Sequence, residues 1–525
     1  MAQPSQGQRL SSPLMQFRQM GAADVDAYAG RYFRFAAIFS ILRILWVIAQ
    51  TSTLLGDPPN QWVVDIEKIV GVALTVYAIT GAIIFAIALY FRTQSESNEP
   101  ISKLITNYAG AVLFIIVASR VSNVVRGDPL PVNIWLGLLQ TGIIRGGIYA
   151  LIALGYTLVY GILFMINFAH GEIMMLGAYG GWLGLMVMVN GGERSFEAGA
   201  ASVAAVLVPL GVVLLFLPLE DIAGRFRKRS SAEDVVAAPR WRVTILSLPI
   251  RILLGAAVGY GALLGLGLTA PHIYELVITI VGLLFVLAIG MLTSVLAVIV
   301  LERIAYRPLR HAPRLTPLIS AIGASIFLQQ VALRIFGPIP RVYRAPRLLS
   351  DPVTIDLDLG RFGIVPISKV GLVMTLLAFG LMALLIFIVR RTKFGRAMRA
   401  VAEDKNTAAL MGANVDRVIV ITFVLGAALA GATGVMLGFR GEQVKPLFGF
   451  SYGLKAFTSA VLGGIGNIPG AVVGGFFLGL AEALGPTALG FNTSWQNVIA
   501  FGLLVLVIIF RPTGLLGEIV AEKKV

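Results

Sequence analysis

Apolar stretches separated by short polar segments run along most of the 525-residue chain. Nearly all of them are long enough to cross a bilayer core of about 30 Å as a helix. About fourteen can be drawn, which predicts an all-α fold, a polytopic transmembrane helical bundle. The predicted spans cover residues 35–55, 69–91, 104–125, 134–164, 168–190, 199–219, 244–270, 276–301, 316–336, 369–389, 418–438, 454–466, 467–485 and 494–511.

The composition is typical of a membrane protein and argues against a soluble enzyme. Hydrophobic residues make up 57% of the chain and charged residues 13%, whereas about a quarter of an average globular domain is charged. The chain has no cysteine and three histidines, so we expect neither a metal site nor a cofactor. It also lacks a Gly-Lys dipeptide and hence a Walker-type phosphate loop, so ATP would have to be hydrolysed by another subunit.

The net charge of +15 fits a membrane topology better than nucleic-acid binding. When the loops are threaded alternately across the membrane, most of the 42 lysines and arginines fall on one side. Basic residues concentrate in cytoplasmic loops, so this bias predicts that both termini are cytoplasmic and that nucleic acid is not a partner. The longest loop, residues 337–368, is expected to hold only a helix or two.

A polar run, Asn167-Phe168-Ala169-His170-Gly171-Glu172, opens a span directly after a long apolar helix. Polar groups inside a membrane are unfavourable unless they line a water-filled path or pair with one another, so Asn167, His170 and Glu172 are candidates for a translocation pathway. A turn here would also leave free backbone N–H groups that suit a carboxylate. The alternative is that Asn167 caps the helix and that His170 and Glu172 are interface residues with local hydrogen bonds.

Glycines interrupt a second apolar stretch, at Gly463-Gly464-Ile465-Gly466-Asn467-Ile468-Pro469-Gly470. This composition does not suit a straight helix, so a broken or re-entrant segment is predicted. The candidate pathway residues of the break are Gly463, Gly464, Gly466 and Asn467. Gly466, Gly470 and Gly474 are spaced four apart, which would place them on one helical face.

Gly177 and Gly181 repeat this spacing after the first polar run. Both halves of the chain therefore present an interruption followed by a helix with small residues. Such paired interruptions indicate a central pathway between repeats in transporters. Close helix packing without a pathway is the alternative for the glycines.

The polar segment 390–417 lies between two strong spans on the predicted cytoplasmic side. It contains small neutral residues beside charged ones, a surface that suits a cytoplasmic partner. The residues assigned to this docking surface are Glu403, Asp404, Ala408, Ala409 and Gly412. The alternative is a basic loop that lies on lipid headgroups.

Four long segments, in order, resemble the branched-chain amino acid permease family of ATP-binding cassette importers, and in particular its H-type subunit. They are GGIYALIALGYTLVYGILFMINFAHGEIMMLGAY at 146–179, ERIAYRPLRHAPRLTPLISAIGASIFLQ at 302–329, FGRAMRAVAEDKNTAALMGANVDRVIVITFVLGAALAG at 394–431, and GLKAFTSAVLGGIGNIPGAVVGGFFLGLAEAL at 453–484.

This resemblance implies a transport subunit, not an enzyme, in a bacterial inner membrane. The chain would form half of the pathway, together with a second permease subunit, two cytoplasmic ATPase subunits and a periplasmic solute-binding protein. It implies a permease transmembrane domain at 131–525, preceded by an extension at 1–130 with about three transmembrane helices. A further helical pair with a basic loop, Arg225–Arg229, would be inserted near 192–285.

Two other functions are compatible with the sequence. The substrate of such a permease could be urea or a short amide. Alternatively, the chain could be an ion-coupled secondary transporter, for which Glu172 and Glu482 are the plausible carboxylates at mid-membrane. A membrane-embedded enzyme is less favoured, because the sequence shows no group of residues with catalytic spacing.

Overall fold

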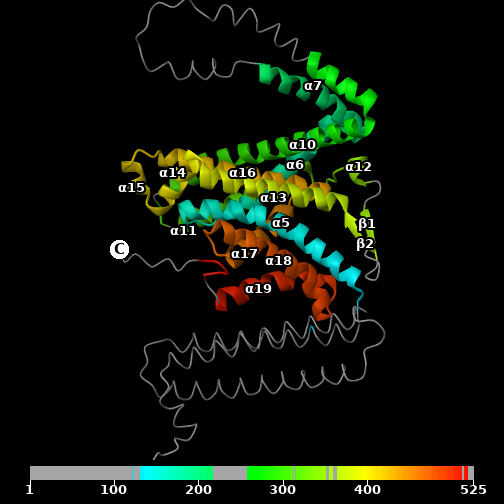
Figure 1. Cartoon of the computed structure of the whole chain (residues 1–525). Coiled ribbons are helices and arrows are strands. Elements are labelled where there is room, and N and C mark those ends of the chain that lie inside the picture. Colours follow the sequence, from blue (N-terminus) through cyan, green and yellow to red (C-terminus); the bar gives the residue numbers. More distant parts are fainter. Residues whose placement is uncertain are drawn as a thin grey trace, which may run out of the picture. The chain divides into compact units, whose positions relative to one another are not determined.

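The computed structural model describes residues 121, 130–216, 257–310, 312–313, 315–350, 354–358, 364–510 and 513–517. These residues are mainly helical, which confirms a polytopic helical membrane protein (Figure 1). The main elements are α5 Val132–Leu163, α6 His170–Met188, α7 Phe196–Phe216, α10 Pro271–Leu301, η3 Glu302–Tyr306, η4 Arg307–Leu309, α11 Leu315–Phe336, α12 Arg347–Ser350, β1 Thr354–Asp358, β2 Ile364–Ser368, α13 Lys369–Arg391, α14 Lys393–Glu403, α15 Lys405–Leu410, α16 Val415–Phe439, α17 Phe448–Gly463, α18 Ile468–Leu489 and α19 Gln496–Phe510.

Within the described residues, 7 helices are long and apolar enough to cross a membrane. Shorter apolar helices cover Phe196–Leu210, Ala257–Thr269 and Thr493–Ile509. From 134 onward, each predicted span has a helix at its position, although only the last part of 244–270 is described. The short stretch predicted at 454–466 corresponds to α17, which has 16 residues.

Several predictions concern residues outside the described part of the chain. They are the spans at 35–55, 69–91 and 104–125, most of the span at 244–270, the basic loop Arg225–Arg229 and the location of both termini. The total of about fourteen spans therefore stays a prediction.

The segment after α11 contains strands that the all-α prediction missed. Loop 337–368 was expected to hold only a helix or two, but besides α12 it forms β1 and β2, which pair in a two-stranded sheet. Both strands have five residues and contain β-branched side chains, which favour extended structure. Strands of five residues are too short to give a clear alternating pattern beside long apolar helices, so they could not be predicted from the sequence.

The chain divides into two compact units. One consists of Met1–Gly146, Asp356–Pro366 and Phe476–Val525, and the other of Gly147–Ile355 and Ile367–Gly475. The second unit, called the central unit below, contains all of α6, α10, α16 and α17.

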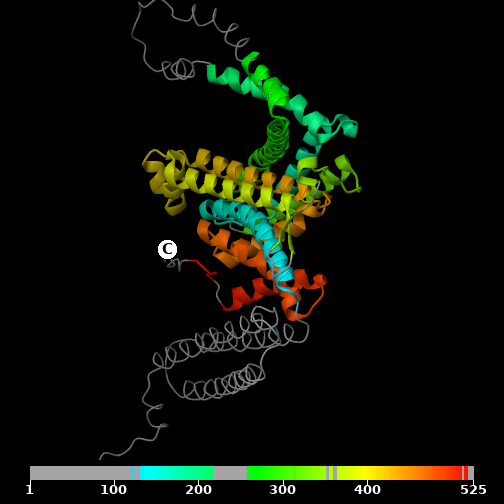
Figure 2. The ribbon, with the colours of Figure 1, turned by 45° about the vertical axis from the view of Figure 1, so that its right-hand side comes forward.

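Helices α6, α10 and α16 pack against one another within the central unit (Figures 1 and 2). Glycines permit this close approach: a Cβ on Gly290 of α10 would lie 2.8 Å from the carbonyl oxygen of Gly177 on α6, and one on Gly431 of α16 would lie 2.7 Å from that of Gly290. The hydroxyl of Ser294 donates a hydrogen bond to the carbonyl of Ile173 at 2.8 Å. Small residues at such contacts let membrane helices gain packing energy where lipid supplies no hydrophobic driving force.

Candidate functional site

The turn between α5 and α6 is organised by Asn167. Its Oδ1 accepts the backbone N–H of Ala169 at 3.1 Å and the hydroxyl of Tyr306 at 2.5 Å. The N-cap of α6 is Ala169, which makes no side-chain cap. Asn167 therefore orders the turn ahead of α6. It does not cap the helix, which was the alternative to a pathway role considered from the sequence. Its Nδ2 is buried without a hydrogen-bond partner among the described residues.

His170 begins α6 and is buried between α5 and its neighbours. Its ring meets Tyr156 edge to face, with centroids 4.8 Å apart. Gly155 leaves room for the imidazole, because a Cβ at that position would overlap Nε2. That nitrogen has no hydrogen-bond partner within the described part of the chain.

Glu172 is a fully buried carboxylate on the first turn of α6. Its Oε1 accepts hydrogen bonds from Gln329 Nε2 at 2.7 Å and from Ser325 Oγ at 3.3 Å, both on α11. Its Oε2 lies against the Cα side of Gly449 on α17 and finds no partner among the described residues. A half-satisfied buried carboxylate is unfavourable for stability, which is typical of functional positions in membranes.

The predicted break in the second half is present. α17 ends at Gly463, Gly464 and Gly466 have φ of 104° and 94°, and α18 begins at Ile468. Such left-handed conformations are open to glycine at little steric penalty. Asn467 Oδ1 accepts the N–H of Gly470 at 3.4 Å, at the start of α18.

One detail of the break differs from the prediction. Gly470 and Gly474 do pack against α17, since Cβ atoms there would meet backbone atoms of Gly463. Gly466, however, lies in the turn before α18 with open space around it, so it does not share their helical face. The four-residue spacing alone could not show where the helix starts.

The segment 167–172 meets residues that sequence reasoning missed, namely Tyr306, Ser325 and Gln329. The described contacts of the glycines in the break are with each other and with neighbouring parts of α17 and α18. Assignment of both segments to one pathway therefore stays a prediction. Glu482, the second carboxylate considered for an ion-coupled transporter, pairs with Arg145 at 3.9 Å.

Segment 393–417 consists of the short helices α14 and α15 and the first residues of α16 (Figures 1 and 2). Three side chains define its helix starts: Thr392 accepts the N–H of Gly395, Asp404 those of Asn406 and Thr407, and Asn414 that of Arg417. Such N-caps satisfy backbone donors that a helix leaves free.

The exposed surface of this segment differs from the predicted docking surface. Ala408 is buried, whereas Ala409 and Gly412 are exposed, as are Glu403 and Asp404. Leu410 and Met411, which sequence reasoning overlooked, are 87% and 84% exposed. Ala408 and Leu410 are two residues apart on α15 and therefore face opposite sides of the helix, one buried and one exposed. Burial and, to a lesser degree, the charge of Arg310 lower the pKa of Lys405 on the same helix.

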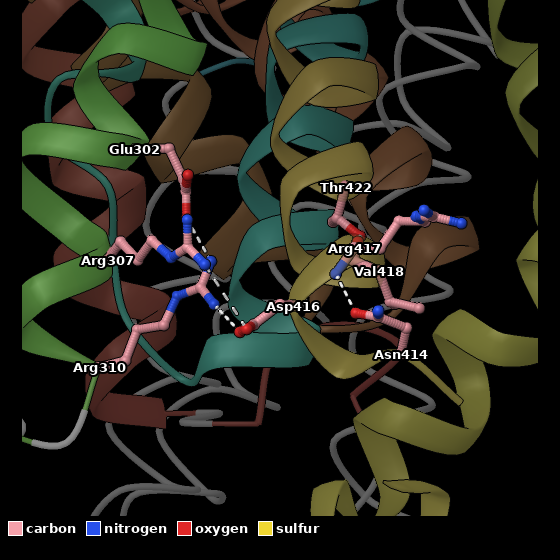
Figure 3. A network of polar contacts seen from close by, with 8 residues as sticks. All are labelled: Glu302, Arg307, Arg310, Asn414, Asp416, Arg417, Val418 and Thr422. Carbon is pink, nitrogen blue, oxygen red and sulfur yellow. Dashed lines mark hydrogen bonds and ion pairs between the residues drawn. The ribbon is translucent and has the colours of Figure 1, made fainter. Parts of the chain in front are cut away.

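An ion-pair network joins the start of α16 to the segment after α10 (Figure 3). Arg310 lies between Asp416 on α16 and Glu302 on η3 and forms ion pairs with both. Arg307 reaches the same Asp416 carboxylate at 3.8 Å. Glu302 is almost fully buried, whereas the Asp416 side chain is 64% exposed. The network therefore connects the surface beside segment 393–417 with the buried end of α10.

Comparison with known proteins agrees with the resemblance of the four segments. Residues 138–508 match the family described as "Branched-chain amino acid transport system / permease component". The chain is 36% identical over 389 residues to the high-affinity branched-chain amino acid transport system permease protein BraD of Pseudomonas aeruginosa, an alignment that covers 74% of this chain and 98% of that protein.

It is 35% identical over 393 residues to the corresponding permease protein LivH of Escherichia coli, with 74% of this chain and 97% of that protein covered. No solved structure matches the chain significantly. The extensive match to the family and to nearly whole relatives confirms the expected transport subunit. The chain therefore belongs to the family of branched-chain amino acid transport system permease components.

Proposed function

We propose that the chain forms half of the membrane pathway of an ATP-binding cassette importer for branched-chain or related small amino acids. The observation that carries this proposal is the match to BraD and LivH over 97–98% of their length, because both are named as high-affinity branched-chain amino acid permeases. A second permease subunit, two cytoplasmic ATPase subunits and a periplasmic solute-binding protein would complete the complex. Its location would be a bacterial inner membrane, with both termini cytoplasmic.

The polar atoms buried between helices support a pathway near Asn167, His170 and Glu172. Each of these side chains has an atom that lacks a hydrogen-bond partner among the described residues. A zwitterionic substrate needs polar groups in the membrane only transiently, and tight binding there would trap it. The Gly463–Asn467 break would form the opposing wall, and specificity would be set mainly by the solute-binding protein.

The exposed tip of α15 supports docking of an ATPase subunit. Leu410 and Met411 project apolar side chains from a segment that the charge distribution assigns to the cytoplasmic side. Together with exposed Ala409 and Gly412, they form a compact surface that suits a groove on a partner. ATP-driven closure of the ATPases would then pull on this segment.

Uptake into proteoliposomes that contain the complete complex tests the substrate. With ATP on the ATPase side and the binding protein outside, we expect labelled leucine, isoleucine or valine to accumulate, and a complex with inactive ATPase to give none. If only urea or a short amide accumulates, the proposed amino-acid substrate is wrong and the permease transports that other class of compound. Uptake that follows an ion gradient without ATP would contradict the importer.

A further inference from the structure

A continuous chain of contacts runs from the start of α16 to the Asn167 turn, entirely within the central unit. We infer that Arg310 and the π-helix η3 (Glu302–Tyr306) are positioning elements that make the start of α16 and the Asn167 turn move together. This inference rests on the proposed function for its role in transport, because segment 393–417 would receive the movement of the ATPases.

The first link lies at the surface. Asp416 is on the first turn of α16, directly after the exposed segment 393–414. Arg310 binds both Asp416 and the buried Glu302, so one guanidinium joins two carboxylates from different elements (Figure 3). Movement of the start of α16 is thus applied to η3 through Arg310.

The second link holds η3 against α16 at a deeper level. Tyr306, the last residue of η3, stacks on Phe423 of α16 with ring centroids 5.5 Å apart and planes at 21°. Phe423 follows Asp416 by about two helical turns. η3 is therefore attached to the same helix at two points, so it follows a displacement of that helix instead of sliding along it.

The third link reaches the candidate pathway. The Tyr306 hydroxyl donates to Asn167 Oδ1 at 2.5 Å, and the same oxygen accepts the N–H of Ala169. A shift of Tyr306 therefore changes the turn that sets the start of α6, next to His170 and Glu172. Tyr306 would act through Asn167 and would not contact the substrate itself.

A purely stabilising role explains this arrangement less well. An ion pair with a partner as exposed as Asp416 is screened by water and contributes little to stability. Single turns of π-helix inside longer helices occur frequently at functional sites, because they depart from regular α-helical packing. Spatial continuity alone does not demonstrate coupling, so the test must show that a change at one end alters the other.

Hydrogen–deuterium exchange of the purified full chain tests the mechanical link without any transport assay. The variants are Asp416→Asn, Arg310→Gln and Tyr306→Phe, the last of which keeps the ring on Phe423. Arg303→Gln is the matched control, because Arg303 is exposed on the same π-helix and has no ion-pair partner within the described residues. Exchange in α13, elsewhere in the same unit, reports whether each variant is folded.

We expect exchange at residues 164–172 to rise about fivefold in Asp416→Asn and Tyr306→Phe, the change that follows from one weakened hydrogen bond. It should rise at least as much in Arg310→Gln, which loses both ion pairs, and stay unchanged in Arg303→Gln. Asp416→Glu, which restores the carboxylate, should return exchange to the wild-type rate. Faster exchange at 302–310 with no change at 164–172 would overturn the inference.

The assembled complex then tests the role in transport. Asp416→Asn and Tyr306→Phe should lower the number of substrate molecules imported per ATP hydrolysed about fivefold, with ATP hydrolysis preserved. An unchanged ratio would overturn that role. If the wild-type complex imports no amino acid, the proposed function fails, while the exchange experiment still decides whether the two ends are linked.

Discussion

At the scale of single residues, the buried polar atoms of segment 167–172 stand out. Asn167 Nδ2, His170 Nε2 and Glu172 Oε2 are buried without partners among the described residues. Buried polar groups normally find a hydrogen bond, since an unpaired one lowers stability by about 1–3 kcal/mol. Three such atoms within six residues fit the proposed translocation pathway, which would supply polar partners transiently.

The sequence could identify these three residues but not their partners. A polar run that opens an apolar span stands out from its surroundings, and its three polar members are buried. Tyr306, Ser325 and Gln329 lie more than 130 positions later and carry no comparable local signal. Their role depends on how helices pack, which local patterns do not show.

Replacing His170 by Gln tests whether proton transfer contributes to transport. The change keeps hydrogen-bonding capacity and similar size but removes titration and the edge contact with Tyr156, which is worth about 1 kcal/mol. We expect uptake within about twofold of wild type at equal expression. Abolished uptake with normal ATPase coupling would instead indicate a proton-linked role and favour an ion-coupled transporter.

At the scale of elements, the apolar stretches predicted where the helices lie, but not which face of a helix is buried. The apolar runs from residue 134 onward correspond to helices because each must satisfy its own backbone hydrogen bonds in lipid. The strands β1 and β2 were missed, and Ala408 was assigned to the surface. The sequence Asp404-Lys405-Asn406-Thr407 could show where α15 begins, because Asp404 caps it, but which face is buried depends on packing against the neighbouring helices.

Leu410 and Met411 test docking without disturbing the fold. We expect Leu410→Ser combined with Met411→Ser to reduce co-purification of the ATPase subunits about tenfold, because exposed apolar side chains act as anchors in a partner's groove. Leu268→Ser is the matched control, since Leu268 is also 87% exposed but lies in another helix. Equal ATPase recovery in the double variant and the control would contradict docking at α15. These variants avoid the strain that any side chain would meet at Gly412, where φ is 85°.

Two substitutions of Gly466 separate backbone strain from obstruction of the pathway. Both Ala and Trp meet the same unfavourable φ of 94°, at about 1–2 kcal/mol, and neither Cβ has a neighbour within 4 Å. Only Trp fills the open space. We expect Gly466→Ala to keep most uptake and Gly466→Trp to abolish it, measured at equal membrane expression. Similar uptake by both variants would exclude Gly466 from the pathway.

At the scale of the whole molecule, the match to the family covers only part of the chain and leaves out its N-terminal residues. The family match begins at residue 138, and the alignments already cover 97–98% of BraD and LivH. The alignments cover 74% of this chain, so about a quarter of it has no counterpart in BraD and LivH. Because the family match begins at residue 138, we expect this quarter to consist mainly of the extension at residues 1–130.

Deletion of residues 1–125 should therefore leave transport largely intact. We expect ATP-dependent uptake within about threefold of the full chain, because the family match begins only at residue 138. The measurement requires a stably inserted variant that recovers normal amounts of ATPase subunits. Loss of uptake by such a variant would show that the extension belongs to the transport machinery.

The most direct test of the account is the accessibility of the two interrupted segments during ATP turnover. Because the chain has no cysteine, Phe168→Cys and Gly466→Cys each introduce one labelling site, and Leu376→Cys on the exposed face of α13 serves as control. In the assembled complex, we predict that maleimide labelling of the first two changes about tenfold between the nucleotide-free and ATP-trapped states, and that labelling of the control does not. Equal labelling of Phe168→Cys and Gly466→Cys in both states would contradict a pathway between these segments.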